Sequence, residues 1–242
     1  HRFSAPEDLE CLVENGAELE ARCNASLTAL FYSCAQFANF EFSAFDWLLA
    51  KGADAFARVA DGESLCHFAV RGRGSVEKLF QLGVPLDLGN NAGVTPLMLA
   101  CQQAETWDAK FLIEHGASVH KRDQQGRTPL MYAAQNPWGP DSIDFLLTHE
   151  ADLEAMDNDG RAALMHAAEF MPENINLDRS SWSSIFTPVS PDILLQRLLD
   201  KGADPNKRDN AGRLAYDVAW GNVTFPESWT LRNLDKVSDR QY

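Results

Sequence analysis

The stretch Gly-Val-Thr-Pro-Leu-Met-Leu-Ala at residues 93–100 decides the fold, because it returns along the chain at a nearly fixed interval. Gly-Arg-Thr-Pro-Leu-Met-Tyr-Ala begins 33 residues later, at 126–133, and Gly-Arg-Ala-Ala-Leu-Met-His-Ala begins 34 residues after that, at 160–167. A period of this size is typical of stacked structural repeats. The sequence therefore predicts one continuous solenoid, although 242 residues could otherwise be divided between two domains.

Each copy of the pattern carries signals for the start and the end of a helix. Thr95 and Thr128 are expected to be N-caps whose hydroxyl groups accept a hydrogen bond from the first turn, and each is followed by proline at the first helical position. Further along, a second apolar run ends in glycine, as in Leu-Leu-Ala-Lys-Gly-Ala-Asp at 48–54 and Leu-Leu-Asp-Lys-Gly-Ala-Asp at 198–204. Glycine in this place is the expected left-handed residue after a helix. Each unit thus predicts two short helices and a loop.

These motifs resemble the ankyrin repeat family, with its T-P-L-H-x-A signature and its G-A-D loop. Ser-Leu-Cys-His-Phe-Ala at 64–69 keeps the signature histidine, 28–33 is an earlier copy, and 214–219 is a degenerate last copy. The resemblance implies an all-α solenoid of helix-turn-helix units with hairpin-like loops. We expect about six repeats, preceded by an N-terminal capping helix near residues 6–14.

One repeat is much longer than the others. The interval from Gly160 to Gly212 is 52 residues, and the excess forms a Ser-, Pro- and Asn-rich insertion that contains Trp182 and Phe186. These aromatic residues either pack back on the solenoid or bind a partner. The expected division of the single domain 1–242 is an N-terminal cap at 1–24, repeats at 25–57, 58–89, 90–122, 123–156 and 157–208, the last with an insertion at 171–191, and a C-terminal cap repeat at 209–242.

The composition limits the kinds of partner. A formal net charge of −14 argues against duplex nucleic acid, which is bound through Lys and Arg, and is compatible with a basic protein partner. No apolar run approaches the ~18 residues of a transmembrane helix, so no membrane contact is expected. The five cysteines lack a C-x-x-C pairing, which favours the cytoplasm or another reducing compartment. Because the chain begins with His1, we expect it to be part of a longer protein.

No motif for catalysis or cofactor binding is present in the sequence. G-x-S-x-G, the phosphate-binding G-x-x-x-x-G-K-[ST] and H-E-x-x-H are all missing, so neither catalytic residues nor a cofactor is predicted. His115 and His149 hold matching positions in neighbouring repeats, which would suit a metal pair. Lys51 and Lys201 occupy the same position elsewhere, however, so a cation near a helix C-terminus explains all four. No metal site is predicted.

The resemblance implies that partners contact the loop tips and the exposed positions of the first helix in each repeat. Arg127, Arg161 and Arg213 share a register there and form a potential ladder for carboxylates of a partner. The candidate partner-binding residues are Arg71, Gln102, Gln103, Gln124, Gln125, Arg127, Gln135, Asn136, Asp159, Arg161 and Arg213 on this surface, and Trp182 and Phe186 in the insertion.

The sequence therefore predicts a non-enzymatic protein-interaction module or scaffold that is a monomer in isolation. Its expected partner is another protein, with a basic surface as one option, and no nucleic acid, membrane or cofactor is expected. Two alternatives stay open: an inhibitor or immunity-type protein that masks a basic partner, and a non-catalytic part of a larger enzyme or effector.

Overall fold

The structure of the chain is a computed structural model that describes residues 6–34, 44–72, 76–103, 106–136, 140–169 and 191–222. Within these ranges the chain forms twelve α-helices, and the single β-type contact is an isolated bridge between Arg58 and Ser64. The helices are α1 (Pro6–Glu14), α2 (Ala29–Cys34), α3 (Ala44–Ala50), α4 (Leu65–Gly72), α5 (Val76–Gln81), α6 (Pro96–Cys101), α7 (Trp107–Glu114), α8 (Pro129–Ala134), α9 (Pro140–Thr148), α10 (Ala163–Glu169), α11 (Pro191–Asp200) and α12 (Ala215–Asn222).

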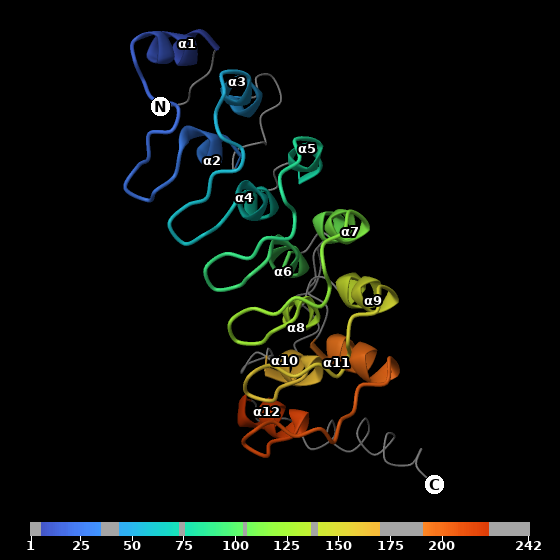
Figure 1. Cartoon of the computed structure of the whole chain (residues 1–242). Coiled ribbons are helices and arrows are strands. Elements are labelled where there is room, and N and C mark those ends of the chain that lie inside the picture. The colour runs from blue at the N-terminus through green and yellow to red at the C-terminus, as the bar shows by residue number, and fades with distance from the viewer. Residues whose placement is uncertain are drawn as a thin grey trace, which may run out of the picture.

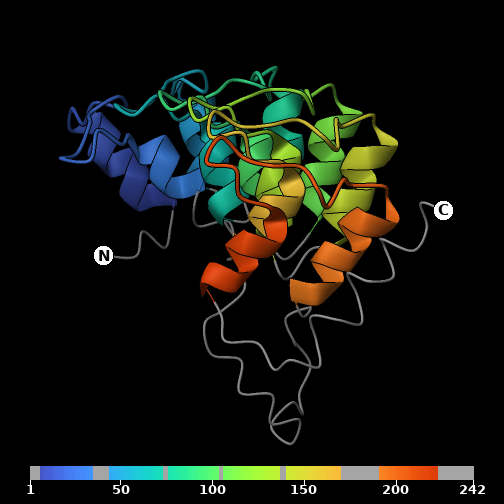
Figure 2. The same ribbon diagram turned by 90° about the horizontal axis from the view of Figure 1, so that it is seen from below.

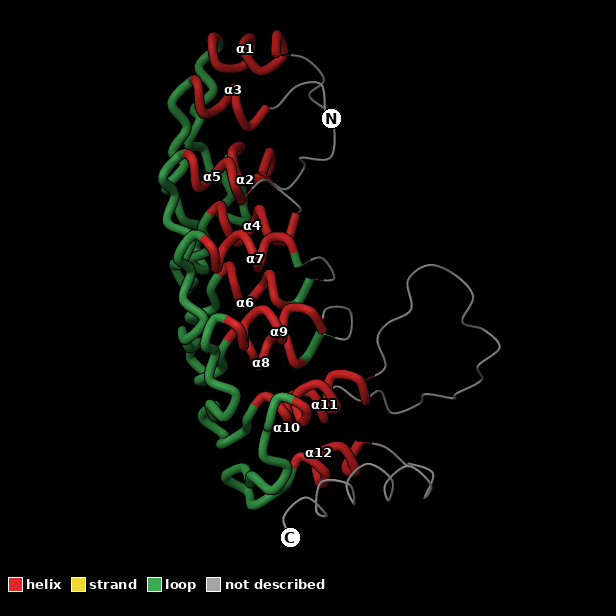
Figure 3. Tube along the Cα trace, turned by 90° about the vertical axis from the view of Figure 1, so that its right-hand side faces the viewer, coloured by secondary structure: helices red, strands yellow, loops and turns green. Residues whose placement is uncertain are grey.

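The helices pack in two rows (Figure 1). The first helices of successive repeats, α2, α4, α6, α8, α10 and α12, contact one another and form the inner row. The second helices α5, α7, α9 and α11 contact one another in the outer row, and each also packs on the first helix of its own repeat. Helix α1 lies at one end beside α3 (Figures 1 and 3). The predicted all-α solenoid with an N-terminal capping helix is confirmed.

The inner helices are stabilised by packing on all sides. All six residues of α6 and all six of α8 are buried. Helices this short are marginal in isolation, so contacts with the neighbouring repeats must stabilise them. Cys34, Cys66 and Cys101 belong to this core, as predicted for Cys34 and Cys101, and burial raises the pKa of each thiol to about 12.

One of the two predicted threonine caps forms a hydrogen bond and the other does not. Thr95 Oγ1 accepts from the Met98 backbone N–H at 3.3 Å. Thr128 is also buried in an extended backbone conformation, but its hydroxyl oxygen has no hydrogen-bond partner among the described residues. Thr128 is therefore the N-cap residue of α8, as predicted from the sequence, but without the predicted hydroxyl hydrogen bond. The Met131 sulfur lies 3.4 Å from the Thr128 backbone nitrogen, and Pro129 fixes the first turn of α8.

The residue after each second helix is left-handed, as predicted, even where it is not glycine. Gly52, Gly116 and Gly202 have φ of 96°, 95° and 97°. Glu150 occupies the same position after α9 and has φ of 66°. The closing hydrogen bonds agree, because Ala117 N donates to Leu112 O at 2.9 Å and Ala151 N donates to Leu146 O at 3.1 Å. Glu150 therefore adopts a conformation that costs an L-residue about 1–2 kcal/mol.

We expect Glu150→Gly to raise the free energy of unfolding by about 1 kcal/mol, since glycine removes the left-handed strain but adds entropy to the unfolded chain. Urea denaturation measures the change. The matched control is Glu114→Gly in the right-handed last turn of α7, which should lower stability by about 1 kcal/mol. A variant Glu150→Gly that is no more stable than the original chain would contradict the prediction.

The predicted insertion at 171–191, with Trp182 and Phe186, lies almost entirely outside the described residues. The proposed repeat boundaries therefore stay a prediction, although the order of helix pairs follows them from α2 to α12.

Candidate interaction surface

The loops between repeats are hairpins that project together on one side of the helices (Figures 2 and 3). Their tips lie at residues 60–61, 91–92, 124–125, 158–159 and 210–211, and backbone hydrogen bonds join each tip to the next. We call this series of bonds the tip ladder. Its backbone bonds run from Asn91 N to Asp61 O at 2.8 Å, Gln124 N to Ala92 O at 2.8 Å, Asn158 N to Gln125 O at 2.9 Å and Asn210 N to Asp159 O at 2.9 Å.

Side-chain amides double every rung of the tip ladder. Each tip after the first begins with Asn or Gln, whose amide nitrogen donates to the preceding tip. These bonds run from Asn91 to Ala60 O at 3.0 Å, Gln124 to Asn91 O at 2.7 Å, Asn158 to Gln124 O at 2.8 Å and Asn210 to Asn158 O at 2.9 Å. The Gln124 side chain, a predicted partner contact, thus holds the tips in register. Its contact with a partner stays a prediction.

A buried carboxylate closes the base of the hairpin at 123–127. Asp123 Oδ1 accepts from the backbone N–H groups of Gln125 and Arg127 at 2.9 and 2.8 Å. Asp123 Oδ2 accepts from Arg127 Nε at 2.8 Å and from the Tyr132 hydroxyl at 2.7 Å. The Asp123 side chain is fully buried. Burial, and to a smaller extent the hydrogen bond to Asp123, raises the pKa of Tyr132 far above its usual range. The Tyr132 hydroxyl therefore keeps its proton and remains a hydrogen-bond donor.

The predicted arginine ladder is paired within the protein. Arg127 Nε lies 2.8 Å from Asp123, Arg213 Nη2 lies 2.8 Å from Asp209, and Arg161 Nη1 lies 3.0 Å from Glu169. Arg71 pairs with Glu63 in the same way. A partner carboxylate must therefore compete with these internal acids for the predicted ladder. Whether the four arginines contact a partner stays a prediction.

His166 links two repeats through a buried polar chain. The ring is 3 % exposed, with Nε2 2.9 Å from Asp157 Oδ2 and Nδ1 3.0 Å from Gln135 Nε2. A neutral ring that donates from Nε2 and accepts at Nδ1 satisfies both neighbours. Burial lowers the pKa of His166 below its ordinary value, more than hydrogen bonding to Asp157 raises it. Gln135, a predicted partner contact, is thus half-buried between α8 and α10.

We expect the stability to fall as the pH decreases below about 6.5, where unfolded histidine takes up a proton. Burial also lowers the pKa of His67, so the folded chain binds protons at His67 and His166 less readily than the unfolded chain does. Both histidines thus stabilise the fold above this pH. The measurement is urea denaturation between pH 7.5 and 5. His166→Gln should reduce the pH dependence, and an unchanged dependence would contradict the prediction.

The remaining predicted contacts differ in exposure. Gln102, Gln125 and Asp159 are exposed, and Gln103 is half-buried. Asn136 is only 3 % exposed, and its amide donates to Cys101 O at 3.1 Å and to Gln103 O at 2.6 Å. The Asn136 side chain therefore joins α8 to the end of α6, and it is poorly placed for direct contact with a partner.

The two matching histidines of the outer row, His115 and His149, hydrogen-bond to the backbone of their own helices. His115 Nδ1 lies 2.8 Å from Phe111 O, and His149 Nδ1 lies 2.9 Å from Phe145 O, so each ring hydrogen-bonds a carbonyl of the last helical turn. This geometry agrees with the predicted role at a helix C-terminus. In the part of the chain that the structure describes, no three His, Cys, Asp or Glu side chains form a group that could hold a metal ion.

The two helical rows and the stacked hairpins define a helix-pair repeat protein. A family model described as ankyrin repeats, in three copies, matches residues 32–123, 66–157 and 118–177. The chain belongs to the ankyrin repeat family, whose repeats are generally modules for protein–protein interaction and typically not catalytic. The comparison with curated proteins gave no match.

Two further observations bear on the setting of the chain. None of the helices in the described ranges has both the length and the apolar character needed to traverse a lipid bilayer. All five cysteines are free thiols, of which Cys11 and Cys23 are exposed. The reducing compartment stays a prediction.

Proposed function

We propose that the chain binds a protein partner through the inner surface formed by the hairpin tips and the exposed ends of the inner helices. The observation that carries this proposal is the tip ladder, in which every rung has a backbone bond and a side-chain bond. Loops held in this way present side chains at fixed spacing, which lowers the entropy lost on binding. Gln102, Gln125 and Asp159 remain exposed on this surface.

The charge supports a partner with basic groups. The four arginines of the surface are paired with carboxylates, whereas Asp61 and Asp159 are exposed at the tips. The net charge of −14 adds a long-range attraction for a cationic protein. This attraction also suits the alternative in which the chain masks a basic partner as an inhibitor. Both versions require an affinity that falls steeply with ionic strength.

The test is affinity capture from the native source, compared between the original chain and two variants of equal charge change. The inner-surface variant is Gln102→Lys with Asp159→Lys. The control variant is Glu14→Lys with Ile193→Lys, on α1 and α11. The side chains replaced in both variants are exposed. Arg127→Glu is avoided, since it would place a second carboxylate beside buried Asp123.

We expect a partner that binds the original chain to bind the control equally and the inner-surface variant at least tenfold more weakly, about 1.4 kcal/mol. Equal binding by all three proteins would place the contact elsewhere and remove the inner surface from the proposal. The insertion at 171–191 is a second candidate contact. Replacement of residues 173–188 by a short Gly-Ser linker tests it. If the insertion contacts the partner, the shortened protein should lose partner binding and keep near-native stability.

A further inference from the structure

The outer face of repeat 58–89 departs from the pattern of the other repeats. A left-handed residue follows the second helix of each repeat. The position directly before that residue is Leu82 in this repeat, and Lys51, His115, His149 or Lys201 in the four others. A cation there is favoured by the helix dipole, and leucine lacks that interaction. Leu82 is nevertheless 41 % exposed, so burial in the core does not account for it.

A second leucine of the same repeat stands where two other repeats carry a lysine that contacts the preceding repeat. Lys121 Nζ contacts the Asp87 backbone oxygen and lies 3.1 Å from Asp87 Oδ2, which ties it to the preceding repeat. Lys207 Nζ does the same with Glu154 O at 2.7 Å. Leu88 holds the matching position one repeat earlier and is 39 % exposed. Repeat 58–89 thus has an exposed leucine at both positions. The first holds Lys or His in the four other repeats, and the second holds Lys in two of them and Ala57 or Ala155 in the other two.

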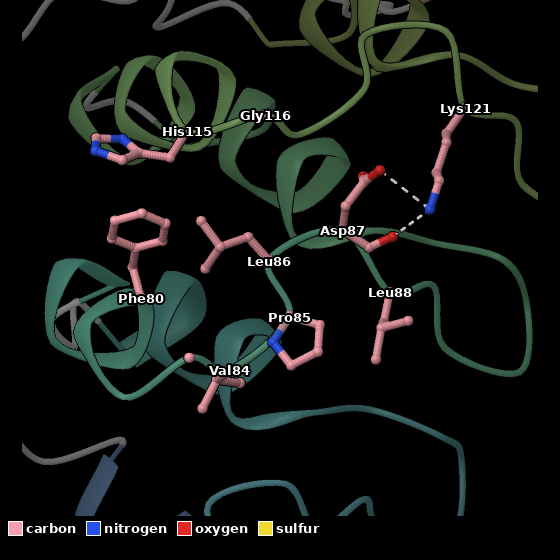
Figure 4. Close-up of a pocket in the computed structure, with 10 residues that line it drawn as sticks. Phe80, Val84, Pro85, Leu86, Asp87, Leu88, His115, Gly116 and Lys121 are labelled. Atoms are coloured by element: carbon pink, nitrogen blue, oxygen red, sulfur yellow. Dashed lines mark hydrogen bonds and ion pairs between the residues drawn. The ribbon is translucent and has the colours of Figure 1, made fainter.

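Leu88 lines a hollow between the outer helices α5 and α7 and their following loops. The hollow has a volume of about 410 Å³ and is lined by Phe80, Leu86, Leu88, His115 and Lys121, among others (Figure 4). Leu82 directly precedes the lining residue Gly83 but does not itself line the hollow. Phe80 is 42 % exposed and Leu88 is 39 % exposed, so two large apolar side chains of the lining face solvent in one place. Such clustering is typical of an interaction site.

The aromatic wall of the hollow is held in a fixed arrangement. The His115 ring stacks on Phe111 with centroids 4.0 Å apart, and its Nδ1 lies 2.8 Å from Phe111 O. Phe80 meets the His115 ring edge to face at 4.4 Å. A wall of rings already packed on one another loses little entropy when it receives another aromatic side chain.

Two exposed carboxylates stand on the helices that flank the hollow. Lys121 is paired with Asp87, so these two charges compensate each other. Glu77 lies one turn before Phe80 on α5, and Glu114 directly precedes His115 on α7. Both glutamates are exposed, and neither has an ion pair within the described residues. With a net charge of −14 overall, the surroundings favour a cationic ligand.

We propose that this hollow is a second docking site, which takes an aromatic side chain flanked by lysine or arginine from a protein partner. The ring packs between Phe80, Leu86 and Leu88, and the flanking cations lie near Glu77 and Glu114. This site is on the outer row of helices and does not depend on the inner surface, so a chain can hold partners on both.

The test uses two peptides, acetyl-Lys-Trp-Lys-amide and acetyl-Glu-Trp-Glu-amide, titrated into the isotope-labelled chain and followed by NMR. We expect the lysine peptide to produce saturable shifts at the amides of residues 80–88 and 115–121. The glutamate peptide should bind at least fivefold more weakly because of repulsion by Glu77 and Glu114. Equal binding of the two peptides, or no saturable shift at these amides, would overturn the proposal.

The variant Leu88→Lys should bind the lysine peptide at least tenfold more weakly. It introduces the residue that this chain carries at the same position in two other repeats, Lys121 and Lys207, so its urea midpoint should not fall. Ile193→Lys, at an exposed position of α11, is the control and should bind as the original chain does. The variant Gln102→Lys with Asp159→Lys should also bind normally. Loss of binding in either of these proteins, or its retention in Leu88→Lys, would overturn the proposal.

Discussion

Replacement of Asp123 by alanine is expected to lower the free energy of unfolding by about 3 kcal/mol. The Asp123 side chain is fully buried and accepts four hydrogen bonds, two from backbone N–H groups, one from Arg127 and one from Tyr132. Alanine leaves all four donors without their acceptor. The Arg127 side chain is 29 % exposed and regains some hydration, so the loss should stay near the lower limit for a buried ion pair.

Asp152→Ala is the matched control. Asp152 is exposed, and its Oδ1 accepts one bond from the backbone of Glu154 at 2.9 Å. Its removal should cost about 1 kcal/mol. Urea denaturation measures both variants. If they lose equal stability, the network around Asp123 contributes no more than an ordinary turn, and the prediction is wrong.

The same variant tests how the inner surface is built. Asp123 fixes the hairpin whose tip, 124–125, bonds to both neighbouring tips. We therefore expect faster hydrogen exchange at the Gln124 and Asn158 backbone N–H groups in Asp123→Ala. In a stack where each repeat contacts only its neighbours, such a local defect weakens the two adjoining interfaces more than distant ones.

The regular part of the fold could be predicted because it depends on local signals that repeat. The T-P-L motif predicts the start of a helix, and α6 begins at Pro96 directly after the Thr95 cap. The glycine position predicts a left-handed residue so consistently that Glu150 adopts the same conformation. This repetition cannot distinguish Thr95 from Thr128, whose hydroxyl bonds differ in otherwise similar surroundings.

The candidate site was harder to predict. The position of a residue within the repeat indicates on which face of the solenoid it lies, but it does not indicate which groups its side chain contacts. Arg127 and Arg213 each follow an aspartate by four residues, Asp123 and Asp209, and this spacing was a visible signal of internal pairing. Asn136 follows an inner helix and therefore looked exposed. The neighbouring repeat covers it, which no single-repeat pattern could show.

The outer hollow was missed for a different reason. Leu82 and Leu88 are ordinary residues when taken singly, and no motif contains them. The signal at Leu88 was its departure from Lys121 and Lys207 in equivalent positions, and only the structure shows that Leu88 lines one hollow with Phe80 and His115. Comparison of repeats within one chain can thus indicate sites that comparison with a family consensus does not.

The tip ladder leads to the last prediction, which concerns Gly126. This glycine has φ of 78°, and a Cβ added to it would lie 2.5 Å from Asn158 Oδ1 and 2.9 Å from the Asn158 backbone nitrogen. Gly126→Ala therefore combines left-handed strain of about 1–2 kcal/mol with displacement of a rung that contains two hydrogen bonds. We expect the free energy of unfolding to fall by about 3 kcal/mol.

Gly116→Ala separates the two contributions. Gly116 has φ of 95°, but an added Cβ would meet nothing within 4 Å, so its substitution should cost only the backbone strain of about 1–2 kcal/mol. The two variants are compared by urea denaturation and by hydrogen exchange at Asn158. Equal losses of stability would mean that the contact between tips contributes little. A larger loss for Gly126→Ala, with faster exchange confined to the neighbouring tips, is expected if the ladder holds the hairpins as one surface.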